Sequence, residues 1–271
     1  MTSPSAPAIP DEVVEAFARD GVVCLRGAFS EAWVDRMRRA VDLALSSPGP
    51  SAKVYTPNGA PGRFSSELGL WTRLEDFRSY AFDSPAPHIA ARLMGSRKIN
   101  LFFDHLLVKE PGTRERTPWH QDYPYWTVSG WQVCSIWMPL DPVEEEVSLQ
   151  LVRGSHRWGV DFQPYNFVDG QPYAGRAHEP PLPDIEADRG RYDIASYALD
   201  PGDCIVFHAS MVHGAAGNVS SHRRRALSTR WTGDDATYLA RQGKVGYPLS
   251  DPGLKTGDPM DCALFPRVLP R

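Results

Sequence analysis

The chain has 271 residues, a formal net charge of −4 at pH 7 and 42% hydrophobic residues. This length is sufficient for one large domain with a sizeable core, and the composition is ordinary for a globular protein. The mildly negative charge argues against a dedicated nucleic-acid binder. No apolar run approaches the ~20 residues that a membrane-spanning helix needs, so we expect no such helix.

Residues 1–10 contain neither the basic region nor the apolar region of a secretory signal peptide, and we expect them to form a short disordered leader. The four cysteines are far apart and form no CxxC pair, which argues against a structural zinc site or a disulfide framework. Three of them lie in apolar, strand-like runs, where buried free thiols are expected. We therefore expect a reducing, cytoplasmic location.

The first third of the chain has the hydrophobic spacing of helices. Residues 11–21 predict a short amphipathic helix that ends at a glycine, and residues 22–27 predict a strand. Residues 30–47 predict a longer helix with Ser30 as its N-cap, and residues 88–95 predict another short helix that stops at a glycine. The N-terminal region is therefore expected to be mainly helical.

From residue 98 onward the pattern changes to alternating or continuous β-type runs. The predicted strands cover residues 98–110, 131–140, 148–156, 202–214 and 224–233, and turn signals such as "EPGT" and "DPGD" separate them. Helices followed by many antiparallel-looking strands predict an α+β, mainly β protein built around a sandwich or barrel. We expect residues 1–271 to form a single domain.

Two segments lack this periodicity. Residues 160–198 are rich in Pro, Gly, Tyr and Asp, and a long insertion of this kind inside a domain is expected to be a functional lid. Residues 234–271 predict an irregular C-terminal tail that wraps the body.

The stretch "TPWHQDYPYW", residues 117–126, predicts a metal site. Residues two apart on an extended segment project to the same side, so His120 and Asp122 can face one ion. Two histidines and one carboxylate leave positions open on a non-haem Fe(II). The His-x-Asp pattern alone is a weak signal and needs a second histidine from a later strand. We favour His213, which resembles a strand end, over His208, which lies mid-strand with the opposite parity.

A co-substrate with a carboxylate would need a fixed cation, and "HRRRALSTRW" offers three arginines on the next predicted strand. The planar guanidinium of arginine matches a carboxylate with two hydrogen bonds. Alternation along a strand puts Arg223 and Arg225 on one face and Arg224 on the other. Only one or two of the three can therefore point inward.

Five segments, in this order, are similar to a known family: "PWHQDYPYW", "CSIWMPLDPVEE", "LVRGSHRWG", "PGDCIVFHASMVHGAAGN" and "RRALSTRW". They resemble the phytanoyl-CoA dioxygenase (PhyH)-like branch of the Fe(II)/2-oxoglutarate-dependent oxygenases. The resemblance covers roughly residues 98–233. It implies a double-stranded β-helix core, also called a jelly roll or cupin-like fold, with supporting N-terminal helices.

The resemblance also implies roles for single residues. Fe(II) would be held by His120, Asp122 and His213, and the distal carboxylate of 2-oxoglutarate by Arg224, eleven positions after the distal histidine. Trp137 would line the 2-oxoglutarate pocket, and O2 would be the further co-substrate. In addition, Trp126 would face the substrate, and His156 of "RGSHRWG" would have a structural role.

The sequence departs from the family at one 2-oxoglutarate contact, where some relatives have a serine and this chain has Ala215. The metal carboxylate is retained as Asp122, which disfavours a halogenase. Two groups of side chains are candidates for substrate contacts. The aromatic candidates are Tyr123, Tyr125, Trp126 and Trp231, and the cationic candidates for an acidic substrate are Lys109, Arg114 and Arg116.

The function that the resemblance implies is hydroxylation of a small molecule, for example a natural-product intermediate, with release of succinate and CO2. Desaturation, cyclisation and epimerisation use the same cofactors, and the sequence does not choose among them. Two alternatives from other classes are a non-catalytic jelly-roll ligand-binding protein and a zinc hydrolase on a cupin-like barrel. The oligomeric state is not predicted by the sequence.

Overall fold

The computed structural model of the protein describes residues 8–270 except 168 and 177. Residues 1–7 of the expected disordered leader, and one end of the C-terminal tail, therefore lie outside the described residues. The helices are α1 (Asp11–Asp20), α2 (Glu31–Ser46), α3 (Glu75–Asp83) and α4 (Ala86–Met94). Three of them were predicted within a few residues, whereas α3 was not. Gly21 and Gly95 end α1 and α4 in the left-handed conformation, with φ of 77° and 62°.

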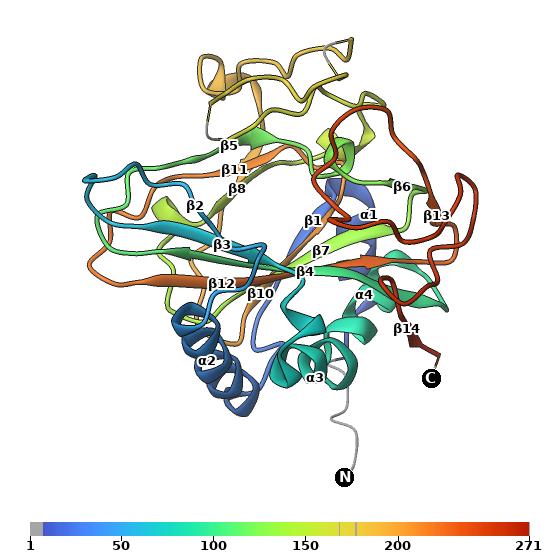
Figure 1. The fold of residues 1–271 in the computed structure, drawn as a ribbon, viewed down its shortest axis with the longest axis horizontal. Coiled ribbons are helices and arrows are strands. Elements are labelled where there is room, and N and C mark those ends of the chain that lie inside the picture. The colour runs from blue at the N-terminus through green and yellow to red at the C-terminus, as the bar shows by residue number, and fades with distance from the viewer. Residues whose placement is uncertain (1–7, 168, 177, 271) are drawn as a thin grey trace.

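Two antiparallel sheets form the body of the molecule (Figure 1). The large sheet has the order β1-β10-β7-β12-β4-β3-β2, and β14 also pairs with β4. Its strands are β1 (Val22–Leu25), β2 (Lys53–Val54), β3 (Phe64–Leu68), β4 (Ile99–Lys109), β7 (Val133–Pro139), β10 (Cys204–His208), β12 (Arg224–Thr232) and β14 (Arg267–Leu269).

The small sheet has the order β5-β11-β8-β9. Its strands are β5 (Thr117–His120), β8 (Leu149–Val152), β9 (Ile194–Ala195) and β11 (His213–Ala215). A further short pair consists of β6 (Val128–Ser129) and β13 (Thr237–Tyr238). This mainly β architecture of facing antiparallel sheets confirms the predicted jelly-roll class, although the sheets do not close into a barrel.

The single strand predicted for residues 202–214 is wrong. The chain forms β10 up to His208, turns through a hydrogen bond from the Met211 amide to the His208 carbonyl, and starts β11 at His213. The two strands belong to different sheets. A continuous apolar run concealed the reversal, because Ala, Met and Val fit a buried turn as well as a strand. His213 is consequently at the beginning of a strand and not at its end.

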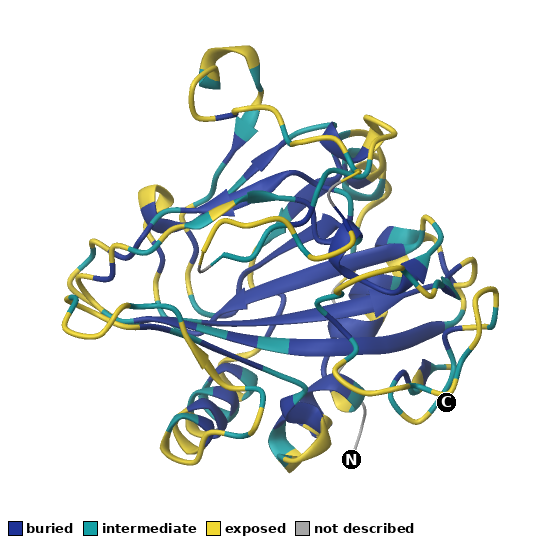
Figure 2. Ribbon diagram, turned by 45° about the horizontal axis from the view of Figure 1, so that its top comes forward, coloured by how far each residue is buried: buried dark blue, intermediate teal, exposed yellow. Residues whose placement is uncertain are grey.

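Helices cover one face of the large sheet, and the small sheet faces the other (Figure 1). Side chains alternate between these faces along each strand. On β12, Leu227 and Trp231 are fully buried in the apolar cluster beneath the helices, whereas Arg224, Ser228 and Arg230 line a cavity between the sheets. The central strands are almost entirely buried, as the dark blue in Figure 2 shows. Apolar clusters thus lie on both faces of these strands, but the face toward the small sheet also carries the polar residues of the cavity wall.

The segment 160–198 divides into two parts. Its first part contributes Tyr165, Phe167 and Tyr173 to the cavity wall. Its second part includes β9, and Ile185 packs there with residues of the small sheet in a separate apolar cluster. In Figure 1 most of the segment lies beyond β5, on the side away from the helices.

The C-terminal tail is mostly irregular, yet it contains β13 and β14 and buries several aromatic and apolar side chains. Tyr247, Met260 and Phe265 pack in a third apolar cluster, and Tyr247 reaches the cavity wall. All four cysteines are unpaired. No helix within the described ranges combines the length and apolar character needed to cross a bilayer.

Candidate active site

The structure brings His120, Asp122 and His213 together. His120 ends β5 and His213 begins β11, and these two residues are direct partners in the pairing of the two strands. Asp122 follows β5 by two residues. One nitrogen or oxygen from each of the three side chains lies within 4.8 Å of the others, and His120 Nε2 is 3.6 Å from Asp122 Oδ1. These distances allow the three atoms to bind one metal ion.

Backbone carbonyls orient both imidazoles. His120 Nδ1 is 2.8 Å from the Pro118 carbonyl oxygen, and His213 Nδ1 is 3.0 Å from the Met211 carbonyl oxygen. A carbonyl oxygen only accepts hydrogen bonds, so each Nδ1 must carry the proton and donate it. Each Nε2 then presents a lone pair to the shared centre, which is the tautomer that a metal-binding histidine needs.

Two polar side chains contact the carboxylate of Asp122. Ser135 Oγ donates to Asp122 Oδ2 at 3.2 Å, and Arg230 Nη2 lies 3.7 Å from the same oxygen. Burial raises the pKa of Asp122, but the positive charge of Arg230 and the nearby His120 lower it by more, so this pKa lies below its usual range. Burial, and then the neighbouring His120, lower the pKa of His213 to about 3. One carboxylate and neutral imidazoles are the donor set that suits Fe(II).

Arg224 is a buried cation that faces the same cavity. It donates one hydrogen bond, from Nη1 to the Val147 carbonyl, and no acidic side chain within the described part of the chain pairs with it. Burial lowers its pKa to about 10, which leaves the guanidinium charged at neutral pH. A buried charge without a partner costs several kcal/mol, so the arrangement suits an anionic ligand.

The neighbouring arginines are occupied elsewhere, as the alternation predicts. Arg225 forms an ion pair with Asp141 at 2.7 Å, and Arg223 forms one with Glu110 at 2.9 Å. Of the three consecutive arginines, Arg224 alone lines the cavity.

The three cationic candidates for an acidic substrate lie outside the cavity wall. Lys109 is buried beside Arg224, and its Nζ donates to the carbonyl oxygens of Glu115 and Ala216, both at 2.9 Å. Arg116 pairs with Glu186, and Arg114 is exposed.

The cavity between the sheets has a volume of about 190 Å³. Its wall includes Trp137, Tyr125 and Trp126, as the sequence predicts. Tyr123 and Trp231 are not part of this wall. The Tyr123 hydroxyl accepts a hydrogen bond from the Gly130 amide, and Trp231 is fully buried in the core beneath the helices. The structure therefore does not bring those two residues to the site.

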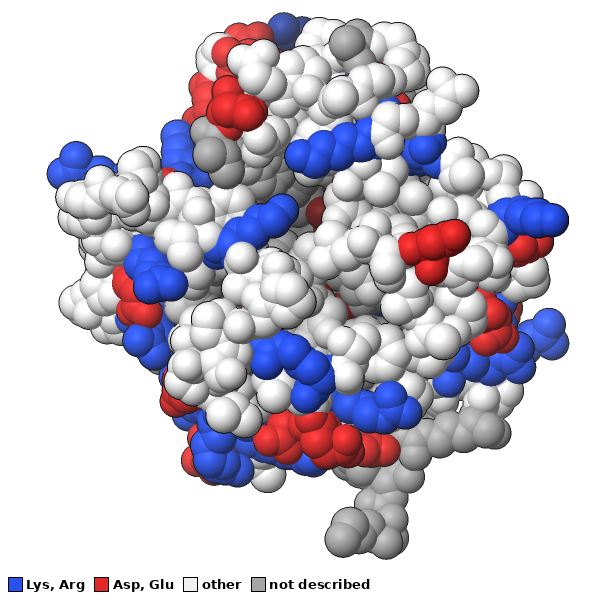
Figure 3. Space-filling model, viewed as in Figure 1, with Lys and Arg blue, Asp and Glu red and all other residues white. Residues whose placement is uncertain are grey.

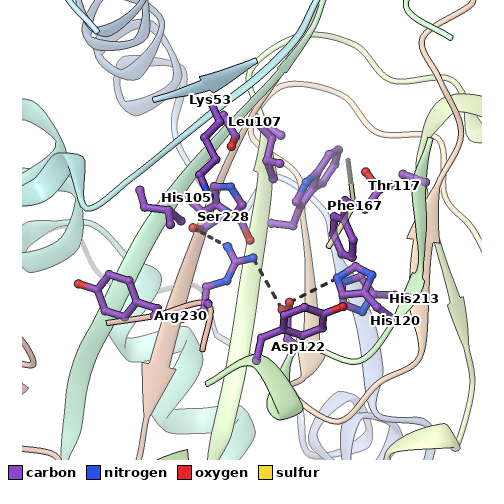
Figure 4. Close-up of a pocket in the computed structure, with 18 of the residues that line it drawn as sticks. Lys53, His105, Leu107, Thr117, His120, Asp122, Phe167, His213, Ser228 and Arg230 are labelled. Atoms are coloured by element: carbon purple, nitrogen blue, oxygen red, sulfur yellow. Dashed lines mark hydrogen bonds and ion pairs between the residues drawn. The ribbon is translucent and has the colours of Figure 1, made fainter. Parts of the chain in front are cut away.

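Sequence reasoning missed several side chains of the cavity wall. Figure 4 shows Lys53, His105, Ser228 and Arg230 on the side of the cavity opposite Phe167 and Thr117. Alternation from Arg224 along β12 could have found Ser228 and Arg230, whereas nothing in the sequence marks Lys53 or His105. The surface is hollowed near the centre of Figure 3, and lysine or arginine side chains lie at the rim of the hollow.

His208 has a structural role. It ends β10, its Nε2 is 2.8 Å from the Trp131 carbonyl oxygen, and its Nδ1 accepts a hydrogen bond from the Ser210 amide at 3.1 Å. His156 is buried as well, and its Nε2 is 3.3 Å from the Ala18 carbonyl oxygen. Neither histidine lines the cavity.

Comparison with known proteins identifies relatives of this architecture. The family described as phytanoyl-CoA dioxygenase (PhyH) matches residues 17–226. The multifunctional dioxygenase prhA of Penicillium brasilianum is 26% identical, over 82% of this chain and 72% of the relative.

Two solved structures have the same fold. The non-haem alpha-ketoglutarate-dependent carbocyclase SnoK from nogalamycin biosynthesis has a TM-score of 0.78 and 22% identity, over 99% of this chain and 100% of that chain. The epimerase SnoN, in complex with Fe3+, alpha ketoglutarate and nogalamycin RO, has a TM-score of 0.74 and 20% identity, over 95% and 98% of the two chains.

Proposed function

Because the chain belongs to the phytanoyl-CoA dioxygenase (PhyH) family of Fe(II)/2-oxoglutarate-dependent oxygenases, we propose that it oxidises a small molecule in the cavity between its sheets, by hydroxylation. Bound Fe(II) and 2-oxoglutarate supply, with O2, an oxidant that removes hydrogen from a C–H bond, with release of succinate and CO2. The chain contributes the ligand geometry, the pairing of the co-substrate and an enclosed pocket.

His120, Asp122 and His213 are the proposed iron ligands. Carbonyl groups fix both imidazole tautomers, and Ser135 and Arg230 fix the carboxylate, so contacts within the protein hold the three donor atoms toward one point. Preorganised ligands reduce the entropy cost of binding.

Arg224 is the proposed partner of the distal carboxylate of 2-oxoglutarate. A guanidinium binds a carboxylate with two parallel hydrogen bonds, and Arg224 has no acidic partner of its own. Trp137 also lines this cavity and provides an apolar surface for the methylene groups of 2-oxoglutarate. Ala215 lines it where some relatives have a serine, so one polar contact is replaced by an apolar one.

The observation that carries this proposal is the coexistence of the three ligands and an unpaired buried arginine in one cavity. A non-catalytic jelly-roll protein needs no convergent ligands, and a zinc hydrolase needs no buried arginine for a co-substrate. The full set of residues therefore favours an oxygenase over both alternatives.

A second reaction outcome has support from the comparisons. SnoK is named a carbocyclase and SnoN an epimerase, and both have this fold. Cyclisation and epimerisation begin with the same removal of hydrogen as hydroxylation. Cyclisation or epimerisation is therefore the second candidate for this chain.

The test is a small-molecule screen with the Fe(II)-loaded chain, 2-oxoglutarate and O2, read out as succinate release and substrate mass. Gain of one oxygen atom supports hydroxylation, loss of two hydrogens supports ring closure or desaturation, and unchanged mass with altered chirality supports epimerisation. Product formation with Zn(II) in place of Fe(II), without succinate, would support the hydrolase instead.

A further inference from the structure

We propose that the cavity contains a second polar subsite, made by His105, Ser228 and Lys53, that binds an anionic oxygen of an aromatic substrate. This inference rests on the proposed function in one respect, namely that the bound molecule is the one oxidised at the metal centre. The anionic oxygen is a carboxylate or a phenolate, since the same donors bind both.

The position of the subsite separates it from the co-substrate site. His105 on β4 and Ser228 on β12 are direct cross-strand partners, and both line the cavity (Figure 4). Ser228 is four residues from Arg224 on the same face of β12, which corresponds to about 13 Å along a strand. An anion at the His105 subsite is therefore distinct from one held by Arg224.

Two polar atoms at this subsite lack partners. His105 Nε2 and Ser228 Oγ are both buried and make no hydrogen bond within the described residues. Buried polar atoms are nearly always paired, and each unpaired one costs about 1–3 kcal/mol. Two such atoms side by side in a cavity wall indicate donors that a ligand uses.

The charge of the cavity wall defines the ligand. Lys53 extends from β2 toward His105 (Figure 4), and no described acidic side chain forms an ion pair with it. The wall also contains Arg230, whereas its one acidic residue is Asp122 at the metal centre. A positively charged wall raises the local concentration of anions. The subsite is therefore suited to an anionic ligand group.

His105 can act as a donor to this anion. Burial, and then Arg230, lower the pKa of His105 to about 3, so that the imidazole is neutral and keeps one N–H. If the proton lies on Nε2, the imidazole N–H and the Ser228 hydroxyl can both donate to one oxygen, while Lys53 supplies the compensating charge.

Aromatic rings form the rest of the wall near the subsite. Phe103 and Tyr247 are stacked with ring centroids 4.1 Å apart, and Trp126 contacts Phe103 edge to face at 5.6 Å. Tyr125 and Phe167 also face the cavity. Flat rings pack well against such surfaces. An aromatic carboxylate or phenolate therefore fits both the walls and the polar end.

The experiment compares two probes of equal shape, 2-naphthoate and the uncharged 2-naphthamide. Calorimetric titrations use the full chain with Fe(II) and saturating 2-oxoglutarate under nitrogen, so that Arg224 is occupied. We expect naphthoate to bind about tenfold more tightly than naphthamide. Lys53→Met is expected to reduce this preference about fivefold, and His105→Leu to reduce it at least as much.

Lys255→Met is the matched control, because Lys255 is an exposed lysine outside the cavity wall and should leave the preference unchanged. Lys53 lies on an exposed two-residue strand, so its replacement should not impair folding, and thermal unfolding checks each variant. Equal affinities for the two probes would overturn the proposal. A preference for naphthoate that survives both Lys53→Met and His105→Leu would also overturn the proposal. The same holds if naphthoate binds in a titration without 2-oxoglutarate but not in one with saturating 2-oxoglutarate.

The result also separates this inference from the proposed function. If Fe(II) and 2-oxoglutarate fail to bind together while the preference and its loss in Lys53→Met persist, the function is wrong and the subsite stands. If they bind and the preference is absent, the function stands and the subsite is wrong.

Discussion

The two faces of β12 differ in composition. On β12, Leu227 and Trp231 pack beneath the helices. The one polar atom of the Trp231 side chain, Nε1, donates a hydrogen bond to Thr229 Oγ1 at 3.0 Å. The alternate residues Arg224, Ser228 and Arg230 face the cavity, and two of these have a buried atom without a partner, Ser228 Oγ and Arg230 Nε.

The difference separates residues that stabilise the fold from residues that we propose to bind ligands. Burial of apolar side chains on the helix face stabilises the folded state by about 25 cal/mol per Å². Unpaired charges and hydroxyls on the cavity face lower that stability, and proteins retain such groups where function needs them. Substitutions on the two faces should therefore affect different measurements.

The largest expected effect concerns the two histidines of the segment that was predicted as one strand. His213→Ala should abolish Fe(II)-dependent succinate release, because it removes one of three convergent donors. His208→Ala should retain succinate release while costing about 1–3 kcal/mol in stability, because it removes structural hydrogen bonds. Equal loss of activity in the two folded variants would contradict the assignment of His213.

The next effect contrasts neighbouring arginines on opposite faces. Arg224→Met should raise the 2-oxoglutarate concentration that gives half-maximal binding by about 10–100-fold, because a charge-assisted pair contributes about 1.5–3 kcal/mol. Arg225→Met should leave that concentration unchanged, since Arg225 pairs with Asp141. The measurement is a 2-oxoglutarate titration. A larger effect from Arg225→Met than from Arg224→Met would show that Arg225, and not Arg224, pairs with the co-substrate.

A third pair tests stability directly. Leu227→Ala should lower the free energy of unfolding by about 2–5 kcal/mol, because Leu227 is fully buried in the core beneath the helices. Ser228→Ala should change it by less than about 0.5 kcal/mol, or raise it, because its hydroxyl has no partner to lose. Urea unfolding measures both variants. A large loss in Ser228→Ala would show that the hydroxyl is structural.

The last expected effect depends on pH and concerns Asp104, a polar residue on the helix face. Burial raises its pKa to about 7, although the Trp71 amide donates to it at 3.0 Å. Between pH 4 and pH 7 the unfolded chain therefore releases this proton while the folded chain keeps it, so stability falls as pH rises.

Asp104→Asn removes the ionisable group and keeps the acceptor for Trp71. Relative to the unsubstituted chain it should be equally stable near pH 4 and more stable by about 3–4 kcal/mol near pH 8, since each pKa unit corresponds to about 1.4 kcal/mol. Thermal unfolding of the metal-free chain at several pH values measures the difference. A gain that is independent of pH would show that Asp104 is ionised in the folded state.

Local periodicity predicted the fold class, and local spacing paired His120 with Asp122. The resemblance to a family supplied His213, because no local pattern joins that residue to β5. Alternation also separated Arg224 from its neighbours. The same rule, applied to Trp231, would have placed it on the face opposite Arg224. Trp231 was included among the substrate candidates because it is aromatic, although the alternation of side chains along the strand argues against it.

Other features depend on contacts that no local pattern encodes. The reversal between His208 and His213 lies inside an apolar run, and its two strands separate because each finds a partner in a different sheet. The α3 sequence combines serine, aspartate and aromatic residues of modest helix propensity, so packing against α2 and α4 decides its conformation. His105 forms the proposed subsite only together with Ser228, which lies beside it on the neighbouring strand but far away in the sequence.

The most direct measurement of the central claim is an anaerobic titration of the chain with Fe(II) and 2-oxoglutarate, followed by visible absorption. A weak metal-to-ligand charge-transfer band should appear when both components are present, and neither component alone should produce it. His213→Ala should lack the band, and Arg224→Met should require more 2-oxoglutarate to form it. Absence of the band in the folded, unsubstituted chain, or an undiminished band in His213→Ala, would contradict the account.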